Sequence, residues 1–298
     1  MSLQKYIALL KTVELGSISL AAEQLGYTQP AVSRMIADLE AKWNVELLRR
    51  SRAGLEASAV CLQLLPILRA VQADCEALDF AVAEIHGAHR GLVRVGVFTS
   101  VADMWIPGLL KTFRQQYPNI EFELIHMESY AEIERGIRHG LVDCGFVRLP
   151  TVEALQVRFL MRDELVAVLP PDHPLANEPE FPVARLEGAP FIKLREKVDF
   201  EVSHFLDSIP YKPQLCDEVG SDHTVLSMVE CGLGMTITHS LIANNPRYHV
   251  VCKGFDMGQY RDIAIAAANN VRLASATKLF IDHVVSQIRE TASFREQL

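Results

Sequence analysis

One short segment near the N-terminus carries side chains that could recognise another molecule through hydrogen bonds. Gln29, Ser33 and Arg34 share one face of a predicted helix, and all three side chains can donate hydrogen bonds. Arg34 also stands four residues before Asp38, so a surface ion pair is the simpler interpretation of Arg34 taken alone. A short basic segment follows and contains Arg49, Arg50 and Arg52. Hydrogen-bond donors and positive charge are therefore concentrated in one region.

Three short helices with tight turns between them are predicted to position these side chains. Apolar residues recur at helical spacing from Leu3 to Val13, and Gly16 and Gly26 end the first and second helices. Thr28 can cap the third helix, and Pro30 suits its first turn. The apolar stripe of that helix comprises Val32, Met35, Ile36 and Leu39. A helix, a glycine-containing turn and a second helix form the layout of a helix-turn-helix.

The charge of the chain is distributed unevenly. Its 298 residues carry a formal net charge of -8, which on average disfavours contact with nucleic acid or an anionic membrane. Residues 1–55 nevertheless carry +2, whereas 56–89 carry -4 and 90–298 carry -6. The apolar runs are shorter than the roughly 20 residues of a membrane helix, and the N-terminus lacks a signal-peptide pattern. We expect a cytoplasmic protein with a basic head and no membrane partner.

Residues 58–89 are predicted to form one long helix. Its apolar stripe recurs every three or four residues and comprises Leu64, Ile67, Leu68, Val71, Cys75, Leu78, Val82 and Ile85. A long helix that its own chain covers only in part needs a partner, which favours a linker and dimerisation helix. The alternative is a helix that packs entirely on its own domain.

Strand and helix patterns alternate from Gly91 onward, which predicts a mostly parallel sheet covered on both faces. The first group comprises a strand at Leu92–Phe98, a single helix at Val101–Tyr117, a strand at Ile120–His126, a helix from Ser129 and a strand at Val142–Val147. The pattern then restarts with strands at Glu164–Leu169, Pro190–Leu194, Gln214–Val219, Gly234–Thr238 and Ile263–Ala267, and helices at Asp199–Ser208, Asp222–Cys231 and Ala274–Thr291. Two α/β lobes fit this pattern better than one.

The sequence resembles the LysR-type transcriptional regulators over essentially its whole length. The residues that carry the resemblance most specifically are Gly16-Ser17-Ile18-Ser19, Ala21-Ala22-Glu23-Gln24-Leu25 and Thr28-Gln29-Pro30-Ala31-Val32-Ser33-Arg34. Weaker support comes from Tyr117-Pro118, from 140–143 and from Val229-Glu230-Cys231-Gly232-Leu233-Gly234. The departures lie around the wing, where Ala53, Ala57 and Cys61 replace residues more usual in the family.

The resemblance implies an α/β protein with three parts. These are a winged helix-turn-helix DNA-binding domain at 1–57, a linker and dimerisation helix at 58–90, and an effector-binding domain at 91–298. The effector domain resembles periplasmic binding proteins, with lobe I at 91–162 and 268–298 and lobe II at 163–267. A ligand is expected between the two lobes.

The same resemblance assigns roles to the head. The third helix is expected in the major groove of double-stranded DNA, where arginine can pair with guanine and glutamine with adenine. The expected DNA-binding residues are Thr28, Gln29, Pro30, Ser33, Arg34, Arg49, Arg50 and Arg52. The wing arginines supply charge that positions the protein without reading sequence.

Strand ends and helix N-termini are expected to line the effector cleft. The candidate effector-binding residues are Thr99, Ser100, Ser129, Arg148, Lys193, Ser221 and His223, with Asp222 and His239 as further second-lobe candidates. Their hydroxyls and cations would suit a small organic anion. The simpler alternatives are N-capping for Ser129 and solvated surface charges for Arg148 and Lys193.

The expected mechanism is allosteric. Paired linker helices form a dimer, contacts between effector lobes form a tetramer, and ligand changes the spacing of the DNA-binding heads. RNA polymerase is a candidate further partner.

Other functional classes lack their motifs. No G-x-S-x-G, H-E-x-x-H or Walker sequence is present, so we expect no enzyme, no cofactor and no metal site. A periplasmic solute-binding protein is the main alternative, because residues 91–298 alone would allow it. The six cysteines fit no disulfide framework, and most are expected to be buried, although Cys216 and Cys231 could form a redox pair.

Overall fold

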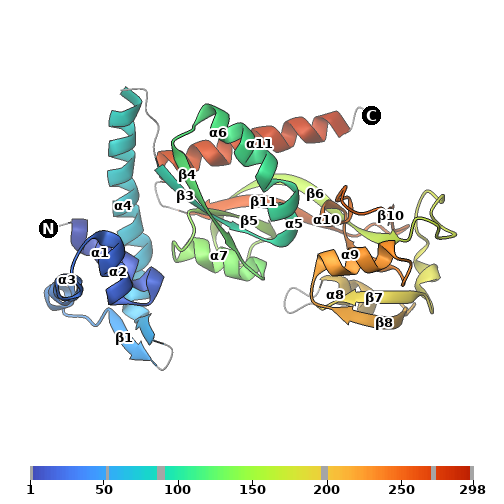
Figure 1. Ribbon diagram of the computed structural model, residues 1–298, viewed down its shortest axis with the longest axis horizontal. Helices are drawn as coiled ribbons and strands as arrows, with labels where there is room; N and C mark the ends of the chain where they lie inside the picture. The colour runs from blue at the N-terminus through green and yellow to red at the C-terminus, as the bar shows by residue number, and fades with distance from the viewer. Residues whose placement is uncertain (1–2, 52–53, 86–90, 196–200, 270–272, 296–298) are drawn as a thin grey trace.

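A computed structural model describes residues 3–51, 54–85, 91–195, 201–269 and 273–295. The N-terminal head is a winged helix-turn-helix, as the sequence predicts. Its elements are α1 (Leu3–Leu15), α2 (Ile18–Leu25), α3 (Gln29–Trp43), β1 (Leu48–Ser51) and β2 (Gly54–Ala57). Strands β1 and β2 pair antiparallel and form the wing. Figure 1 shows the head at one end of the molecule and the second lobe at the other.

Local sequence signals account for the turn between α2 and α3. The Ser17 hydroxyl accepts a hydrogen bond from the Leu20 amide at 3.4 Å and caps α2. Gly26 ends the helix with φ 70°, a conformation that glycine adopts without steric penalty. Pro30 lies in the first turn of α3, where the missing amide hydrogen has no helical partner.

Helix α4 (Ala59–Ile85) leads from the head to the lobes. Its first turns belong to the head, because Cys61, Leu65 and Leu68 are buried in the same core as α1 and α3. The opposite side is uncovered, with Ile67 62% and Leu78 67% exposed. Packing on the chain's own domain therefore accounts for only one face of this helix.

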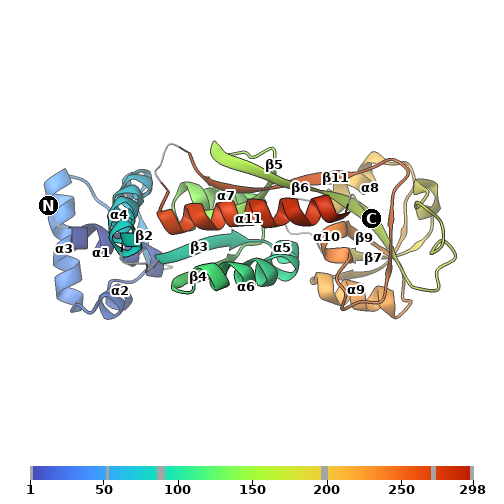
Figure 2. The ribbon, with the colours of Figure 1, turned by 90° about the horizontal axis from the view of Figure 1, so that it is seen from above.

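Lobe I lies between α4 and lobe II (Figure 2). Its elements are β3 (Gly91–Val97), α5 (Thr99–Met104), α6 (Ile106–Gln116), β4 (Ile120–His126), α7 (Tyr130–Arg138), β5 (Cys144–Leu149) and α11 (Ser275–Arg295). Helices α6 and α11 cover one face of the sheet and α7 covers the other (Figure 1).

Two long strands cross between the lobes. Strand β6 (Leu155–Leu169) pairs with β11 (Tyr260–Ala268) in its first part and with β9 (Thr236–His239) and β10 (Val251–Gly254) in its second part. The main path through the sheet is β10-β6-β11-β5-β3-β4. Among the described strands of this sheet the only parallel pairs are those of β3 with β4 and with β5, so the prediction of a mostly parallel sheet was wrong. The crossing strands run antiparallel to their neighbours because they carry the chain from one lobe to the other and back.

Lobe II builds a smaller parallel pair on these strands. Its remaining elements are η1 (Val183–Leu186), β7 (Pro190–Leu194), α8 (Glu201–Ser208), β8 (Gln214–Val219), α9 (Asp222–Glu230) and α10 (Ser240–Ala243). Strands β7 and β8 pair parallel, as the alternating pattern predicts. The sequence analysis missed α10, β10 and the first half of β6.

The predicted single helix at Val101–Tyr117 is divided in two. Helix α5 ends at Met104, and α6 begins at Ile106 with Pro107 in its first turn. A proline cannot donate the amide hydrogen that a continuous helix would need there, so the helix breaks at Trp105.

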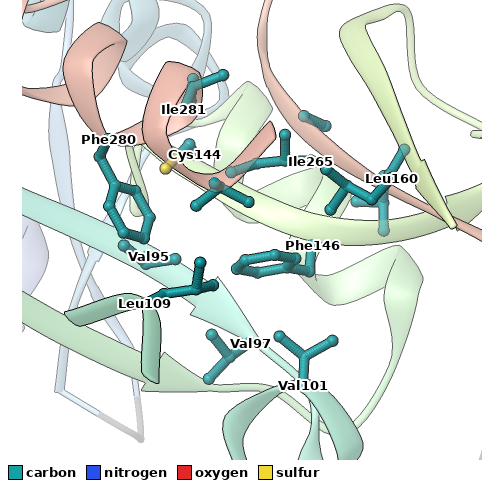
Figure 3. Packing of buried hydrophobic residues seen from close by; sticks show 14 of the residues in the cluster. Val95, Val97, Val101, Leu109, Cys144, Phe146, Leu160, Ile265, Phe280 and Ile281 are labelled. Atoms are coloured by element: carbon teal, nitrogen blue, oxygen red, sulfur yellow. The ribbon is translucent and has the colours of Figure 1, made fainter. Parts of the chain in front are cut away.

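A continuous apolar core holds lobe I together. Figure 3 shows Leu109 of α6 facing Val97 and Phe146 of the sheet, with Phe280 of α11 near Val95. Leu109 is 4% exposed, whereas Leu215 on β8 is 56% exposed. Among the described helices none is long and apolar enough to cross a membrane.

A matched pair of leucine substitutions tests this core. Leu109→Ala is expected to lower the free energy of unfolding by about 2–5 kcal/mol, because it removes buried methyl groups and leaves a cavity. Leu215→Ala should change it by no more than about 0.5 kcal/mol. Urea denaturation of the full chain measures both; equal losses would contradict the packing described for α6.

Candidate nucleic-acid interface and ligand pocket

The third helix presents polar side chains on one face and core residues on the other. Gln29 and Arg34 are exposed and Ser33 is half-buried. Val32 and Ile36 are buried in the head, at 0% and 4% exposure. Thr28 and Pro30 are exposed at the start of the helix, and Thr28 makes no side-chain capping hydrogen bond. The structure thus places the five predicted residues of this segment on one accessible end and face of α3.

The ion pair between Arg34 and Asp38, which is the simpler interpretation of Arg34, is not formed. Asp38 pairs instead with Lys5 of α1 at 2.6 Å, and this contact lowers the pKa of the Asp38 carboxyl, with a smaller contribution from the Arg34 charge. Arg34 makes no ion pair with any of the described residues and, with Pro30, Ala31, Met35 and Asp38, lines a shallow hollow of about 660 Å³. Its guanidinium is therefore available to a ligand.

The wing is described only in part. Arg49 is exposed and its Nε lies 3.0 Å from a carboxylate oxygen of Glu46. The backbone of Arg50 pairs with Leu55 across the wing. Arg52 and the atypical Ala53 lie outside the described residues. Cys61 is buried in the head core, and burial raises the pKa of its thiol to about 11.

A pocket of about 280 Å³ opens between the lobes. Among the predicted residues it brings together Thr99, Ser100 and Ser129 from lobe I, with Asp222 and His239 from lobe II. The Thr99 hydroxyl lies 3.2 Å from Nε2 of His126, another lining residue.

Four further candidates do not line this pocket. Arg148 borders a neighbouring hollow of about 310 Å³. Lys193 is half-buried in β7, and the next two residues of the chain, Leu194 and Arg195, line the pocket instead. Ser221 occupies the N-cap position of α9. His223 contacts Asp103, with Nε2 3.0 Å from Oδ2, and Tyr248, with Nδ1 2.8 Å from the hydroxyl.

Ser129 caps a helix, which is the simpler of the two interpretations of this residue. Its hydroxyl accepts a hydrogen bond from the Glu132 amide at 3.1 Å and caps α7. Because Ser129 and Tyr130 also line the pocket, the N-terminus of α7 opens toward it. The capping role and a position in the pocket wall coexist.

The most highly connected residue of the pocket, Arg261, was missed in the sequence. Its Nε and Nη2 donate to Asp163 at 3.0 and 2.7 Å, Nη2 also donates to Ser100 at 2.8 Å, and Nη1 donates to the Tyr130 hydroxyl. The Arg261 side chain is 7% exposed and that of Asp163 is fully buried. No local signal identifies it, because Arg261 and Asp262 both precede the apolar run of β11 and only the fold shows that Arg261 is the buried one.

Glu201 of α8 joins lobe II to lobe I at the same place. Its carboxylate accepts hydrogen bonds from Arg148 and from the Tyr130 hydroxyl, both at 3.1 Å. Nη1 of Arg261 lies 3.9 Å from Oε2 and Nε2 of His239 lies 3.7 Å from it. Glu201 and His239 line both hollows and so form the wall between them.

Burial dominates the ionisation of this cluster. It raises the pKa of Glu201, although Arg261 and Arg148 act in the opposite direction. Burial, reinforced by the same two arginines, holds the pKa of His239 well below its ordinary value, so His239 is neutral at pH 7. Burial also raises the pKa of Asp222. The pocket therefore combines hydroxyls, the neutral imidazole of His239 and one neutralised arginine, which suits binding of a polar ligand.

Metal-ligating and redox arrangements are not formed by the described residues. No group of three histidine, cysteine, aspartate or glutamate side chains within them could hold a metal ion. All six cysteines are free; Cys61 and Cys144 are buried, whereas Cys216 and Cys231 are exposed. The expectation that most cysteines are buried was therefore only partly correct.

Comparison with known proteins assigns both parts of the chain. Residues 3–61 match the family described as "Bacterial regulatory helix-turn-helix protein, lysR family", and residues 86–289 match "LysR substrate binding domain". The HTH-type transcriptional regulator CbbR of Sinorhizobium medicae is 33% identical over 237 residues, which cover 76% of this chain and 74% of CbbR.

Two solved structures share the fold. Full-length OxyR of Pseudomonas aeruginosa superposes with a TM-score of 0.77 at 18% identity, covering 97% of this chain and 95% of OxyR. The CcmR regulatory domain of Synechocystis in complex with 2-PG has a TM-score of 0.60 at 22% identity, and the match covers 67% of this chain and 98% of that domain. The chain belongs to the LysR family of DNA-binding transcriptional regulators with an effector-binding domain.

Proposed function

We propose that this regulator binds operator DNA through α3 and the wing, and that a small organic anion in the pocket between the lobes changes this binding. The observation that supports it best is the geometry of α3, whose polar face is accessible while its other face forms the head core. We divide the chain into a DNA-binding domain at 1–57, a linker helix at 58–90 and an effector domain at 91–298. The effector lobes are 91–162 with 268–298, and 163–267.

The residues of the head receive separate roles. Arg34 pairs with guanine and Gln29 with adenine in the major groove, with Ser33 beside them. Thr28 and Pro30 lie near phosphates at the helix start, where the amide groups favour an anion. The wing arginines Arg49, Arg50 and Arg52 contact the DNA backbone.

Self-association follows from the uncovered face of α4. Its exposed apolar residues recur at spacings of four and seven and include Val60, Ile67, Val71, Leu78 and Val82. This repeat is typical of a helix that pairs with a second copy. Two heads on one dimer compensate for the weak positive charge of each head.

Exposed apolar side chains on the lobe I sheet, such as Leu124 and Phe159, suit a second interface and hence a tetramer.

This function also implies a cellular location and a further partner. Operator DNA places the protein in the cytoplasm, and RNA polymerase at the same promoter is its further macromolecular partner. We assign no catalytic role to the chain.

Glu201 already accepts the hydrogen bonds that an anionic effector would take over. Glu201 of lobe II receives hydrogen bonds from Tyr130 and Arg148, both of lobe I. An effector carboxylate or phosphate can take over these donors and the nearby Arg261, with Thr99 and Ser100 as further hydroxyl partners. Because Glu201 joins the lobes, replacing it alters the contact between them, so the effector has different affinities for two lobe arrangements.

Two substitutions in the head distinguish recognition of the DNA sequence from non-specific attraction by positive charge. Arg34→Ala is expected to remove most discrimination between the operator and random DNA, a loss of about 1–3 kcal/mol. Arg49→Ala should weaken both and reduce the slope of log K against log salt by about one. Arg185→Ala, which removes an exposed charge from lobe II, is the matched control. Fluorescence anisotropy with an operator selected from genomic fragments measures all three. Intact sequence preference in Arg34→Ala would refute the assignment.

The linker interface has its own test. Leu78→Glu is expected to weaken the dimer at least about tenfold, because it places a charge in an apolar helix pair. Gln63→Glu introduces the same charge at an exposed polar position of α4 and should leave the dimer intact. Sedimentation analysis over a dilution series measures the dimer affinity. A Leu78→Glu chain that associates like the wild type would exclude α4 as the interface.

Glu201 should make stability depend on pH. Its raised pKa means that the folded state favours the protonated carboxyl. The stability gained from this protonation is complete below the ordinary pKa of 4.5 and is lost as the pH rises through the raised pKa. Glu201→Gln abolishes the titration, and its unfolding free energy relative to wild type should therefore rise between about pH 5 and pH 7.5. Glu178→Gln, at an exposed position, should show no such trend. Urea denaturation at both pH values measures the difference, and a fall with pH would contradict the assigned environment.

A further inference from the structure

Three buried polar atoms that lack a hydrogen-bond partner belong to residues that line one cavity. Among the described residues, Nε of Arg69, Nε of Arg94 and Oγ1 of Thr277 are buried and lack a hydrogen-bond partner. All three residues line one cavity of about 70 Å³, where α4 meets lobe I. Buried polar atoms in native proteins are nearly always satisfied by protein, water or an ion. Their convergence on a single cavity points to a shared bound partner.

Arg69 of α4 packs closely against the loop that follows α7 in lobe I. The aliphatic part of Arg69 lies against Gly140, where a Cβ atom would stand 2.0 Å from Cδ of Arg69. Gly140 has φ +67°, so glycine is favoured there for its backbone as well. The loop after α7 thus accommodates the arginine stem only because residue 140 has no side chain.

The surrounding charges leave Arg69 as the cation in need of a counterion. Nε of Arg94 forms an ion pair with Glu123 at 3.3 Å but no hydrogen bond, and its backbone amide donates at 2.8 Å to Asp143, which also lines the cavity. Arg138 is held by both carboxylate oxygens of Glu153, at 3.0 and 2.8 Å.

Arg69 itself makes no ion pair or hydrogen bond with the described residues. Burial, followed by the Arg94 charge, lowers its pKa, while Asp143 and Glu14 act more weakly in the opposite direction. A buried Nε–H donor without an acceptor is unfavourable, and on a cationic side chain its expected partner is an anion.

We propose that this cavity binds a small monovalent anion such as chloride, held by Arg69 of α4 together with Arg94 and Thr277 of lobe I. A water molecule occupies about 30 Å³ in the liquid, so the cavity has room for one halide and a water molecule and is small for a larger organic anion. The site is separate from the effector pocket, with which it shares no lining residue. Its ligand joins the helix that carries the DNA-binding head to the lobe that senses the effector.

Bromide gives a direct test, because it replaces chloride and scatters anomalously. Crystals of the full chain grown in sodium bromide should show an anomalous peak in the cavity, within hydrogen-bonding reach of Nε of Arg69 and Nε of Arg94. A cavity that holds only water at high bromide concentration would refute the proposal.

A thermal titration of the full chain tests the site in solution. Sodium gluconate, whose anion exceeds the cavity, is exchanged for sodium chloride at constant ionic strength. The melting temperature of the wild type should rise and saturate, because chloride binds the folded state. Thr277→Val replaces only the hydroxyl and should raise the half-saturating chloride concentration about tenfold. Arg69→Gln should abolish the saturable response.

The control is Arg185→Gln, which removes an exposed charge from lobe II at a residue that does not line the cavity. Its half-saturating chloride concentration should match that of the wild type. If Arg69→Gln does not fold, Thr277→Val carries the comparison alone. A chloride response that is unchanged in Thr277→Val, or absent from the wild type, would overturn the proposal.

Discussion

The buried guanidinium of Arg261 is the constraint on which the sensor half of this protein depends. An arginine that remains charged when withdrawn from water must find acceptors in fixed directions. Here they come from three other elements: Asp163 on β6, Ser100 on α5 and Tyr130 on α7. The other oxygen of Asp163 accepts from the hydroxyl of Ser240 and the amide of Leu241 at the start of α10, both at 2.9 Å. One charge pair thereby fixes the mutual positions of five elements where the lobes meet.

This arrangement determines what remains for a ligand. Because Asp163 neutralises Arg261 inside the protein, the pocket offers the directional donors of Arg261 without a full unpaired charge. Glu201 then acts as an acceptor supplied by the chain itself, from the opposite lobe. A ligand that replaces Glu201 must compensate for the loss of its contacts, which makes recognition in this pocket selective for acceptors of similar size and charge.

The sequence identified features whose causes are local. Gly26, Pro30 and the stripe of α3 predicted the head correctly, because caps and periodicity act within a few residues. The division of α5 from α6 was also legible in Pro107, and was missed because the apolar period continues across it. Arg261 and Glu201 could not be predicted, since their partners lie far away in the sequence and a charge beside an apolar run carries no information about what it will meet. Thr99 and Ser100, predicted at a strand end, line the pocket, whereas Lys193 does not. Arg195, which follows the last residue of β7, lines it instead, and the point at which a strand ends depends on its tertiary contacts.

Helix α7 links the two polar sites of lobe I. Its N-terminus, with Ser129 and Tyr130, lines the effector pocket, and its C-terminal end, from Ile137 to Gly140, lines the cavity beside α4. Nine helical residues span about 13 Å and behave as a rigid rod on this scale. Gly140, two residues after the end of α7, cannot move toward α4 without colliding with Arg69. Since the first turns of α4 share the core of the head, packed elements run without interruption from the pocket between the lobes through α7 and Arg69 to the DNA-binding head.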